Sequence, residues 1–295
     1  MKSLTLCLLS LIHFGLHAQQ IQFLDLPSFF DREFEVSGLT GNDTNLYLAA
    51  ERCGKIFVIN KENMTHVHTI DLNMDTLQDD LEIEGLSIYK DYLLMTDESK
   101  GKLFSLNFKT NKIREVKING KDISSFQDDY GVEGIAVDET SNIVYVLRER
   151  NKDHQSEIYT FHITDSREVI NLKYKSKTLV QHKNSKWRYS GLAIDKDRRR
   201  LLCLKSFHFK DEPSLDKREI EYIPYGSLSN TKSNPSQLLS LTDEIYFLRH
   251  SFAVNVEGIF YDGNSIFVVS DNGDGNSRDC DDKASKTVMI RILLD

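Results

Sequence analysis

The chain has 295 residues, 28% of them charged, and a formal net charge of −8. A chain of this length can bury a sizeable core, and all-β folds often keep such a length in one domain. An acidic chain without a basic tract is poorly suited to nucleic acid or anionic membranes, and it suits a cation or a small ligand better. We expect the protein to be a monomer.

The first residues have the layout of a secretory signal peptide. Lys2 gives a positive start, Leu4 to Ile12 form an apolar stretch, and Ala18 offers a small residue for cleavage. That stretch is too short to span a bilayer, and no later stretch approaches the roughly 20 apolar residues of a membrane helix. We therefore predict a signal peptide over residues 1–18, a single domain over residues 19–295, and a secreted or periplasmic protein. The alternative is a buried N-terminal helix or strand.

Three cysteines follow the predicted signal peptide: Cys53, Cys203 and Cys280. Their wide spacing excludes a CxxC metal or redox motif. An odd number in an oxidising compartment allows at most one internal disulfide and leaves one thiol over. Cys203 lies in an apolar run, which favours a place in the core.

A Ser-Gly or Glu-Gly pair followed by an aliphatic residue recurs five times along the chain. The five glycines are Gly38, Gly85, Gly134, Gly191 and Gly258, and the intervals between them run from 47 to 67 residues. A period of about 50 residues is typical of a four-stranded propeller blade. The longest interval contains an irregular stretch over residues 206–235, which we interpret as an insertion within a blade.

Each repeat reads as a series of strands. A short apolar strand follows the glycine, and a second strand rich in β-branched and aromatic residues comes after a turn. The second strands are expected at residues 46–49, 92–95, 143–146, 201–204 and 266–269. Third strands are expected at residues 55–59, 102–106, 157–161 and 218–223, and polar fourth strands at residues 66–70 and 237–241.

The last repeat leaves no room for a fourth strand, whereas residues 21–26 form a strand without a blade of their own. Pairing this N-terminal strand with the last blade removes both open edges. The sequence therefore predicts an all-β, five-bladed β-propeller, with its ring closed by the N-terminal strand.

The first strand of a propeller blade is innermost, so the residue that opens it faces the central axis. Those residues are, in chain order, Ser37, Glu84, Glu133, Ser190 and Glu257. Three converging carboxylates repel one another unless protons or a cation neutralise them. Oxygen ligands with room for water favour a hard cation, and Ca²⁺ tolerates irregular geometry better than Mg²⁺. We therefore predict an axial Ca²⁺ site; the alternative is that these are turn residues with solvated acids.

The blade openings, with second strands that end in acidic and basic residues, resemble the SdiA-regulated and phytase-like esterase propeller families. The resemblance is strongest over Gly131–Asp138 and Tyr145–Glu149. It implies a five- or six-bladed propeller that is usually exported and holds calcium at its axis. The axial order Ser, Glu, Glu, Ser, Glu also resembles calcium-activated nucleotidases (apyrases), but their longer blades and substrate loops have no counterpart here.

Second strands end on the face where first strands begin, so their last residues are expected to ring the mouth above the axis. This predicted ring holds Glu51, Arg52, Asp97, Glu98, Arg148, Glu149, Lys205 and Asp271. Mixed charge around a cation suits a small phosphorylated or carboxylated ligand. The alternative is solvated charges that pair with each other. The acidic loop from Asp271 to Asp282 is either a second, weak calcium site or an exposed turn.

Two functions follow. The first is a secreted calcium-binding propeller that binds a small, phosphorylated or carboxylated molecule at its mouth. The alternative is a calcium-dependent hydrolase of phosphate esters or nucleotides, in which the metal polarises the phosphoryl group and an acid activates water. No G-x-S-x-G element, P-loop or G-x-G-x-x-G motif occurs, so the sequence identifies no catalytic residue.

Overall fold

The computed structural model describes residues 20–31, 34–72, 81–120, 131–165, 168–207, 217–228, 232–233, 235–241, 255–271 and 287–294. These residues form β-strands and two short 3₁₀ turns, Ser28–Asp31 and Tyr225–Ser227, with no α-helix among them. None of the described segments is a helix long and apolar enough to cross a membrane. The prediction that residues 1–18 are a signal peptide lies outside the described residues.

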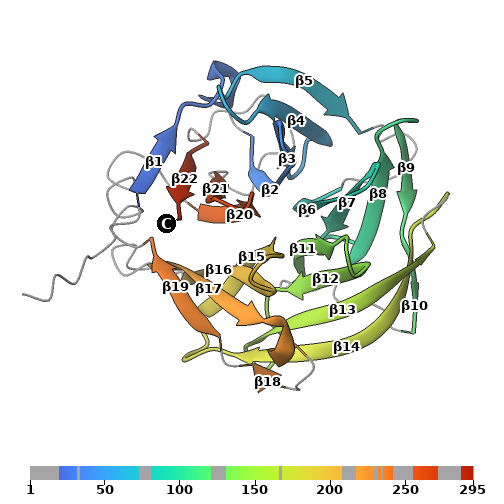
Figure 1. Ribbon diagram of the computed structural model, residues 1–295. Helices are drawn as coiled ribbons and strands as arrows, with labels where there is room; N and C mark the ends of the chain where they lie inside the picture. The colour runs from blue at the N-terminus through green and yellow to red at the C-terminus, as the bar shows by residue number, and fades with distance from the viewer. Residues whose placement is uncertain are drawn as a thin grey trace, which may run out of the picture.

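The strands form five sheets arranged around a central axis (Figure 1). The first blade contains β2 (Val36–Gly41), β3 (Asn45–Ala50), β4 (Lys55–Asn60) and β5 (His66–Asp71). The second contains β6 (Ile83–Tyr89), β7 (Tyr92–Asp97), β8 (Lys102–Asn107) and β9 (Lys112–Glu115). In both blades every strand pairs antiparallel with the next in the chain.

The third blade contains β11 (Val132–Asp138), β12 (Ile143–Arg148), β13 (Gln155–Asp165) and β14 (Asn171–Gln181). Its last two strands have 11 residues each, longer than the sequence pattern indicates. The extra length is used at the outer edge, where β10 (Lys117–Asn119) and β18 (Lys232–Ser233) pair in parallel with β14.

The fourth blade contains β15 (Trp187–Asp195), β16 (Arg200–Phe207), β17 (Lys217–Pro224) and β19 (Ser236–Ser240). The fifth contains β20 (Asn255–Tyr261), β21 (Ser265–Asp271), β22 (Met289–Leu293) and β1 (Gln20–Leu24). The strand β1 pairs antiparallel with β22, from Gln20 opposite Leu293 to Leu24 opposite Met289. The two ends of the described chain therefore share one sheet.

The first strands of the five blades are innermost, and each packs against the first strand of the next blade. The strand β20 of the fifth blade in turn lies against β2 of the first. The prediction of an all-β, five-bladed β-propeller is confirmed.

The core is divided into five apolar clusters among the described residues, one between each pair of neighbouring blades. Leu94 and Val146 meet between the second and third blades, and Ile220 and Ile266 between the fourth and fifth. Inner strands are thus covered on both faces, which accounts for their near-continuous apolar sequences.

Candidate functional site

A β-bulge occurs in each of the five first strands, at the Ser-Gly or Glu-Gly pair. The pairing register slips between Val36 and Gly38 in β2, and at the equivalent position in the other four first strands. A bulge adds a residue that has no partner across the ladder and re-aims its side chain. The residues displaced in this way include Ser37, Glu84, Glu133, Ser190 and Glu257.

The glycine after each axial residue allows neighbouring first strands to approach closely. A Cβ atom on Gly191 would lie 2.2 Å from the carbonyl oxygen of Glu257 in the next blade. A Cβ atom on Gly85 would lie 2.8 Å from the Cα of Gly134. Backbone atoms rather than flexible side chains are the obstacle, so a larger residue at either position would force the blades apart.

Four of the five predicted axial residues line one small cavity. Ser37, Glu84, Glu133 and Glu257 surround a space of about 10 Å³, which is room for about one water molecule. Ser190 is not among the lining residues, because its hydroxyl donates to the carbonyl oxygen of Val256 at 3.0 Å. Beyond the acids, five aliphatic side chains line the same cavity; this aliphatic ring consists of Leu39, Leu86, Ile135, Leu192 and Ile259.

The axial carboxyls are buried, and burial is the main cause that raises their pKa values. It raises the pKa of Glu84 well above the usual range, and the charges of Glu51 and Glu133 raise it further. Burial also raises the pKa of Glu133, to which the carboxylate of Glu98 adds. The pKa of Glu257 is raised by burial too, although Arg188 opposes this shift. The raised pKa values mean that the folded protein holds protons on these carboxyls more strongly than the unfolded chain does.

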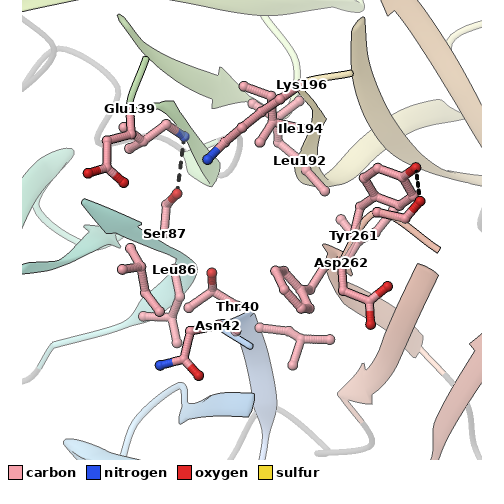
Figure 2. Close-up of a pocket in the computed structure, with 18 of the residues that line it drawn as sticks. Thr40, Asn42, Leu86, Ser87, Glu139, Leu192, Ile194, Lys196, Tyr261 and Asp262 are labelled. Carbon is pink, nitrogen blue, oxygen red and sulfur yellow. Dashed lines mark hydrogen bonds between the residues drawn. The ribbon is translucent and has the colours of Figure 1, made fainter. Parts of the chain in front are cut away.

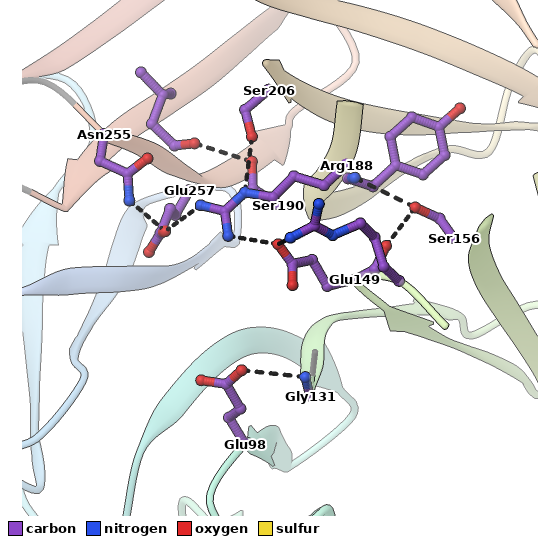
Figure 3. Close-up of polar contacts among 12 residues, drawn as sticks. Glu98, Gly131, Glu149, Ser156, Arg188, Ser190, Ser206, Asn255 and Glu257 are labelled. Carbon is purple, nitrogen blue, oxygen red and sulfur yellow. Dashed lines mark hydrogen bonds and ion pairs between the residues drawn. The ribbon is translucent and has the colours of Figure 1, made fainter. Parts of the chain in front are cut away.

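Arg188 provides a positive charge inside this acidic cluster, and Figure 3 shows its guanidinium between Glu149 and Glu257. It donates to Glu149 Oε1 at 2.5 Å and to Ser206 Oγ at 3.2 Å, and it lies 3.7 Å from Glu257 Oε1. These carboxylates hold the pKa of Arg188 above its ordinary value despite its burial.

Sequence reasoning missed Arg188, although its position offered a signal. It lies two residues before the axial Ser190, and the residues at the same offset in the other blades are Glu35, Glu82, Gly131 and Asn255. Arg188 is therefore the one basic residue at this point of the repeat.

The acids that follow the second strands of the first three blades lie around the same cluster. Glu51 accepts a hydrogen bond from Ser37 at 3.5 Å, and Glu98 accepts one from the Gly131 amide at 3.2 Å. Burial raises the pKa of Glu98, and the charge of Glu149 adds to this. Glu149 is paired with Arg188, as described above. These three predicted ligand-site residues therefore surround the axial acids.

Arg52 also lies on this side, with its guanidinium Nε 2.9 Å from Glu51, 3.6 Å from Glu35 and 3.7 Å from Glu82. It is one quarter exposed. Arg52 therefore stands in an acidic environment and remains accessible to solvent.

Three further residues of the predicted ring have partners within their own blades. Asp97 is fully buried and accepts a hydrogen bond from Ser99 at 2.8 Å. Arg148 lies 3.4 Å from Glu157 Oε2 in β13. Lys205 is 2.7 Å from Glu221 and 4.4 Å from the ring centre of Trp187. The side chain of Asp271 and the loop that follows it lie outside what the structure describes, as does the predicted second cation site.

A buried serine–histidine pair supports the backbone beside Glu149. Ser156 Oγ donates to the Glu149 carbonyl oxygen at 2.5 Å and lies 2.8 Å from His182 Nε2. Since the serine proton is used in this way, the histidine is the donor in their contact. Burial lowers the pKa of His182 to about 4, and Ser156 is fully buried. The pair therefore holds the mouth in shape and is not placed to attack a substrate.

The donors at the axis fit a hard cation in kind, because they are carboxylate and hydroxyl oxygens around a cavity of about one water. As the side chains lie, however, no three His, Cys, Asp or Glu residues among those described are grouped so as to hold a metal ion. Coordination would require these carboxylates to come closer together.

The two cysteines within the described residues, Cys53 and Cys203, differ in state. Cys53 is disulfide-bonded, whereas Cys203 is free and buried in the core, where burial raises the pKa of its thiol. The prediction for Cys203 is thus confirmed.

One protein-family model matches part of the chain. The family model described as SdiA-regulated matches residues 69–206, which include β6 to β16. This segment contains Glu84, Glu133 and Arg188. It confirms the SdiA-regulated part of the resemblance. No curated protein matches the chain.

Solved structures are similar in fold. The glutaminyl cyclase of Myxococcus xanthus is 11% identical over 94% of this chain and 98% of that chain, with a TM-score of 0.52. A chain of a nidogen/laminin complex is 14% identical over 88% of this chain and 86% of that chain, with a TM-score of 0.49. At 11% identity the likeness to the glutaminyl cyclase concerns the fold alone.

Proposed function

We propose that this SdiA-regulated β-propeller is an exported calcium-binding protein that holds one Ca²⁺ at its axis and binds a small anionic ligand above it. The observation that carries the proposal is the set of buried carboxylates, Glu84, Glu133 and Glu257, which three different blades place around a cavity of about one water.

The negative charge of the buried axial carboxylates favours a bound cation. Burying carboxylates together is unfavourable unless the negative charge is neutralised. Arg188 compensates for one charge, and it is shared between Glu149 and Glu257. Glu84 and Glu133 therefore keep protons or exchange them for a cation. A divalent ion with flexible coordination suits oxygens that come from separate blades, which favours Ca²⁺ over Mg²⁺.

Two arginines near the axial acids, Arg188 and Arg52, favour an anionic ligand. The Arg188 side chain is 23% exposed, and its guanidinium contacts Glu149 and the axial Glu257. Arg52 is accessible on the same side. A phosphate or carboxylate group is well matched to a guanidinium and can contact an adjacent Ca²⁺ at the same time. This arrangement supports a small phosphorylated or carboxylated ligand.

Export is supported by two observations. Disulfides persist in oxidising compartments, and Cys53 is disulfide-bonded. The N-terminal apolar stretch after Lys2 has the layout of a signal peptide.

Hydrolysis of phosphate esters or nucleotides is the second candidate, and Glu98 favours it. A general acid needs a pKa above that of a free carboxyl; burial raises the pKa of Glu98, which lies beside the axial acids and accepts a hydrogen bond from the Gly131 amide. In this scheme Glu98 holds the proton that the leaving group needs, and a calcium ion at the axis would supply polarisation of the phosphoryl group.

Thermal unfolding with chelator and with added Ca²⁺ or Mg²⁺ tests the cation. Ca²⁺ is expected to raise the melting temperature, because an ion that binds only the folded state adds about 2.7 kcal/mol at a hundred times its Kd. Mg²⁺ is expected to have a smaller effect. The same melting temperature in chelator and in Ca²⁺ would show that the axis holds no calcium.

A panel of nucleotides, inositol phosphates and simple esters, tested with added Ca²⁺, separates the two functions. A ligand that raises the melting temperature without turnover supports the binding protein. Calcium-dependent turnover that is lost in Glu98→Gln supports the hydrolase. If no compound is bound or turned over, the mouth is not an anion site.

Arg188→Met is expected to have opposite effects on the two ligands. Removing a positive charge within 4 Å of the axial Glu257 should tighten Ca²⁺ binding about tenfold. The same change should abolish the response to a phosphorylated ligand, since the guanidinium is gone. Calcium titration and ligand-dependent melting check both effects. Arg114→Met is the matched control, because Arg114 is exposed on the outer strand β9. Equal calcium affinity in Arg188→Met and the wild type would contradict the assignment of Arg188.

A further inference from the structure

A larger cavity lies at the other end of the channel, where the first strands finish. It has a volume of about 400 Å³, within the range of small-molecule pockets. Its walls come from the last residues of all five first strands and from the turns that follow them. Four members of the aliphatic ring, Leu39, Leu86, Leu192 and Ile259, belong to its apolar lining. The cavity is thus on the opposite side of that ring from the axial acids.

Three hydrogen-bond donors point into this cavity. Figure 2 shows the ammonium of Lys196 and the hydroxyls of Thr40 and Ser87 directed between the strand ends. Thr40 is 6% exposed, and its hydroxyl has no partner among the described residues. Ser87 Oγ accepts the Val137 amide proton at 3.1 Å, so its own proton is available to a ligand. The ammonium of Lys196 has no ion-pair partner in the described part of the chain.

The hydroxyl of Thr40 is therefore available to donate its proton to a molecule in the cavity. Two hydroxyl protons and one ammonium form a donor set for a single oxyanion. Phe260 and the aliphatic side chains that line the cavity provide apolar surface beside it. The combination matches a molecule with one anionic group and an apolar body.

The charge around the rim decides which anion is favoured. Asp43, Glu139 and Asp197 are exposed at the rim, while Lys61 is paired with Asp262 at 3.3 Å. The acids thus outnumber the lysine that remains, Lys196. A dianionic phosphate would be repelled more strongly than a monoanion, and an ammonium group on the ligand would be tolerated.

We propose that this cavity binds a small organic monocarboxylate. Lys196 Nζ and the hydroxyls of Thr40 and Ser87 hold the carboxylate, and the apolar body packs against Leu86, Leu192 and Phe260. The site is separate from the one proposed at the mouth and does not require calcium.

Calorimetric titration of the full chain with phenylacetate, in a buffer that contains chelator, tests the proposal. Saturable binding is expected in the wild type. Lys196→Met should weaken it about tenfold, and Thr40→Val, which keeps the shape but removes the hydroxyl, about fivefold. Lys175→Met is the matched control and should bind as the wild type does, since Lys175 is exposed on β14 away from the cavity.

Phenylacetamide and phenyl phosphate define the ligand class. Both are expected to bind more weakly than phenylacetate, because one lacks the charge and the other carries a second one. No binding of phenylacetate would overturn the proposal, as would binding that Lys196→Met and Thr40→Val leave unchanged. Equal or tighter binding of either analogue would overturn the assignment to carboxylates. Since calcium is absent throughout, none of these outcomes depends on the axial site.

Discussion

Gly191→Ala is expected to lower the free energy of unfolding by about 3 kcal/mol or more, at the upper end of the usual cost of overpacking. The new Cβ atom would lie 2.2 Å from the carbonyl oxygen of Glu257 and 3.1 Å from Cγ2 of Ile259. Both atoms belong to β20 of the next blade, so β15 and β20 would have to separate at the axis. Urea unfolding measures the change as a shift in the midpoint.

Gly226→Ala is the matched control. No heavy atom lies within 4 Å of a Cβ built on Gly226, so this change is expected to stay within about 0.5 kcal/mol of the wild type. If Gly191→Ala and Gly226→Ala unfold at the same urea concentration, the close approach of the first strands does not limit stability.

Replacing Glu84 and Glu133 together by glutamine is expected to abolish the calcium response and to stabilise the calcium-free protein at pH 8. Burial raises the pKa of both carboxyls, so the folded protein holds protons that the unfolded chain releases above its pKa of about 4.5. The free energy of unfolding therefore falls as the pH rises above that value. Glutamine does not titrate in this range, so the fall disappears.

Melting curves at pH 5 and pH 8, in chelator and in Ca²⁺, check both parts of this prediction. The wild type in chelator should lose stability between the two pH values by more than the double variant does. Glu168→Gln, a change at an exposed position, should behave as the wild type. A double variant that calcium still stabilises as much as the wild type would exclude these two acids as ligands.

The blades were predictable because their signal repeats. Five glycines at intervals of 47 to 67 residues fix the number of blades, and the strands after them fall close to the expected ranges. The bulges were not predicted, since register depends on the pairing of two strands, and no single strand reveals it.

The mouth was predicted in part, and the reason is the alternation of side chains along a strand. Glu51, Glu98 and Glu149 occupy one equivalent position in three blades, and they lie around the axial acids. Asp97 and Arg148 come one residue earlier in their blades, and their partners are Ser99 and Glu157. The sequence prediction placed the last residue of a second strand and the residue after it in the same ring. Neighbouring residues of a strand point to opposite faces of the sheet, so only one of the two positions lies near the axial acids.

Arg188 and the cavity near Lys196 depend on distances between blades, which no local pattern contains. The contact of Arg188 with Glu149 joins residues 39 positions apart, in different blades. Lys196 and Thr40 come from blades that are not consecutive in the chain. Both features therefore required the structure.

The aliphatic ring limits the passage of ions between the two ends of the channel. Five side chains without polar atoms stand between the axial acids and the larger cavity, so passage of an ion through the centre would be unfavourable. The axial cavity and the larger cavity therefore open on opposite ends of the propeller. An ion at the axis would leave past the mouth, so a ligand bound at the mouth would slow its release. A molecule in the larger cavity would not.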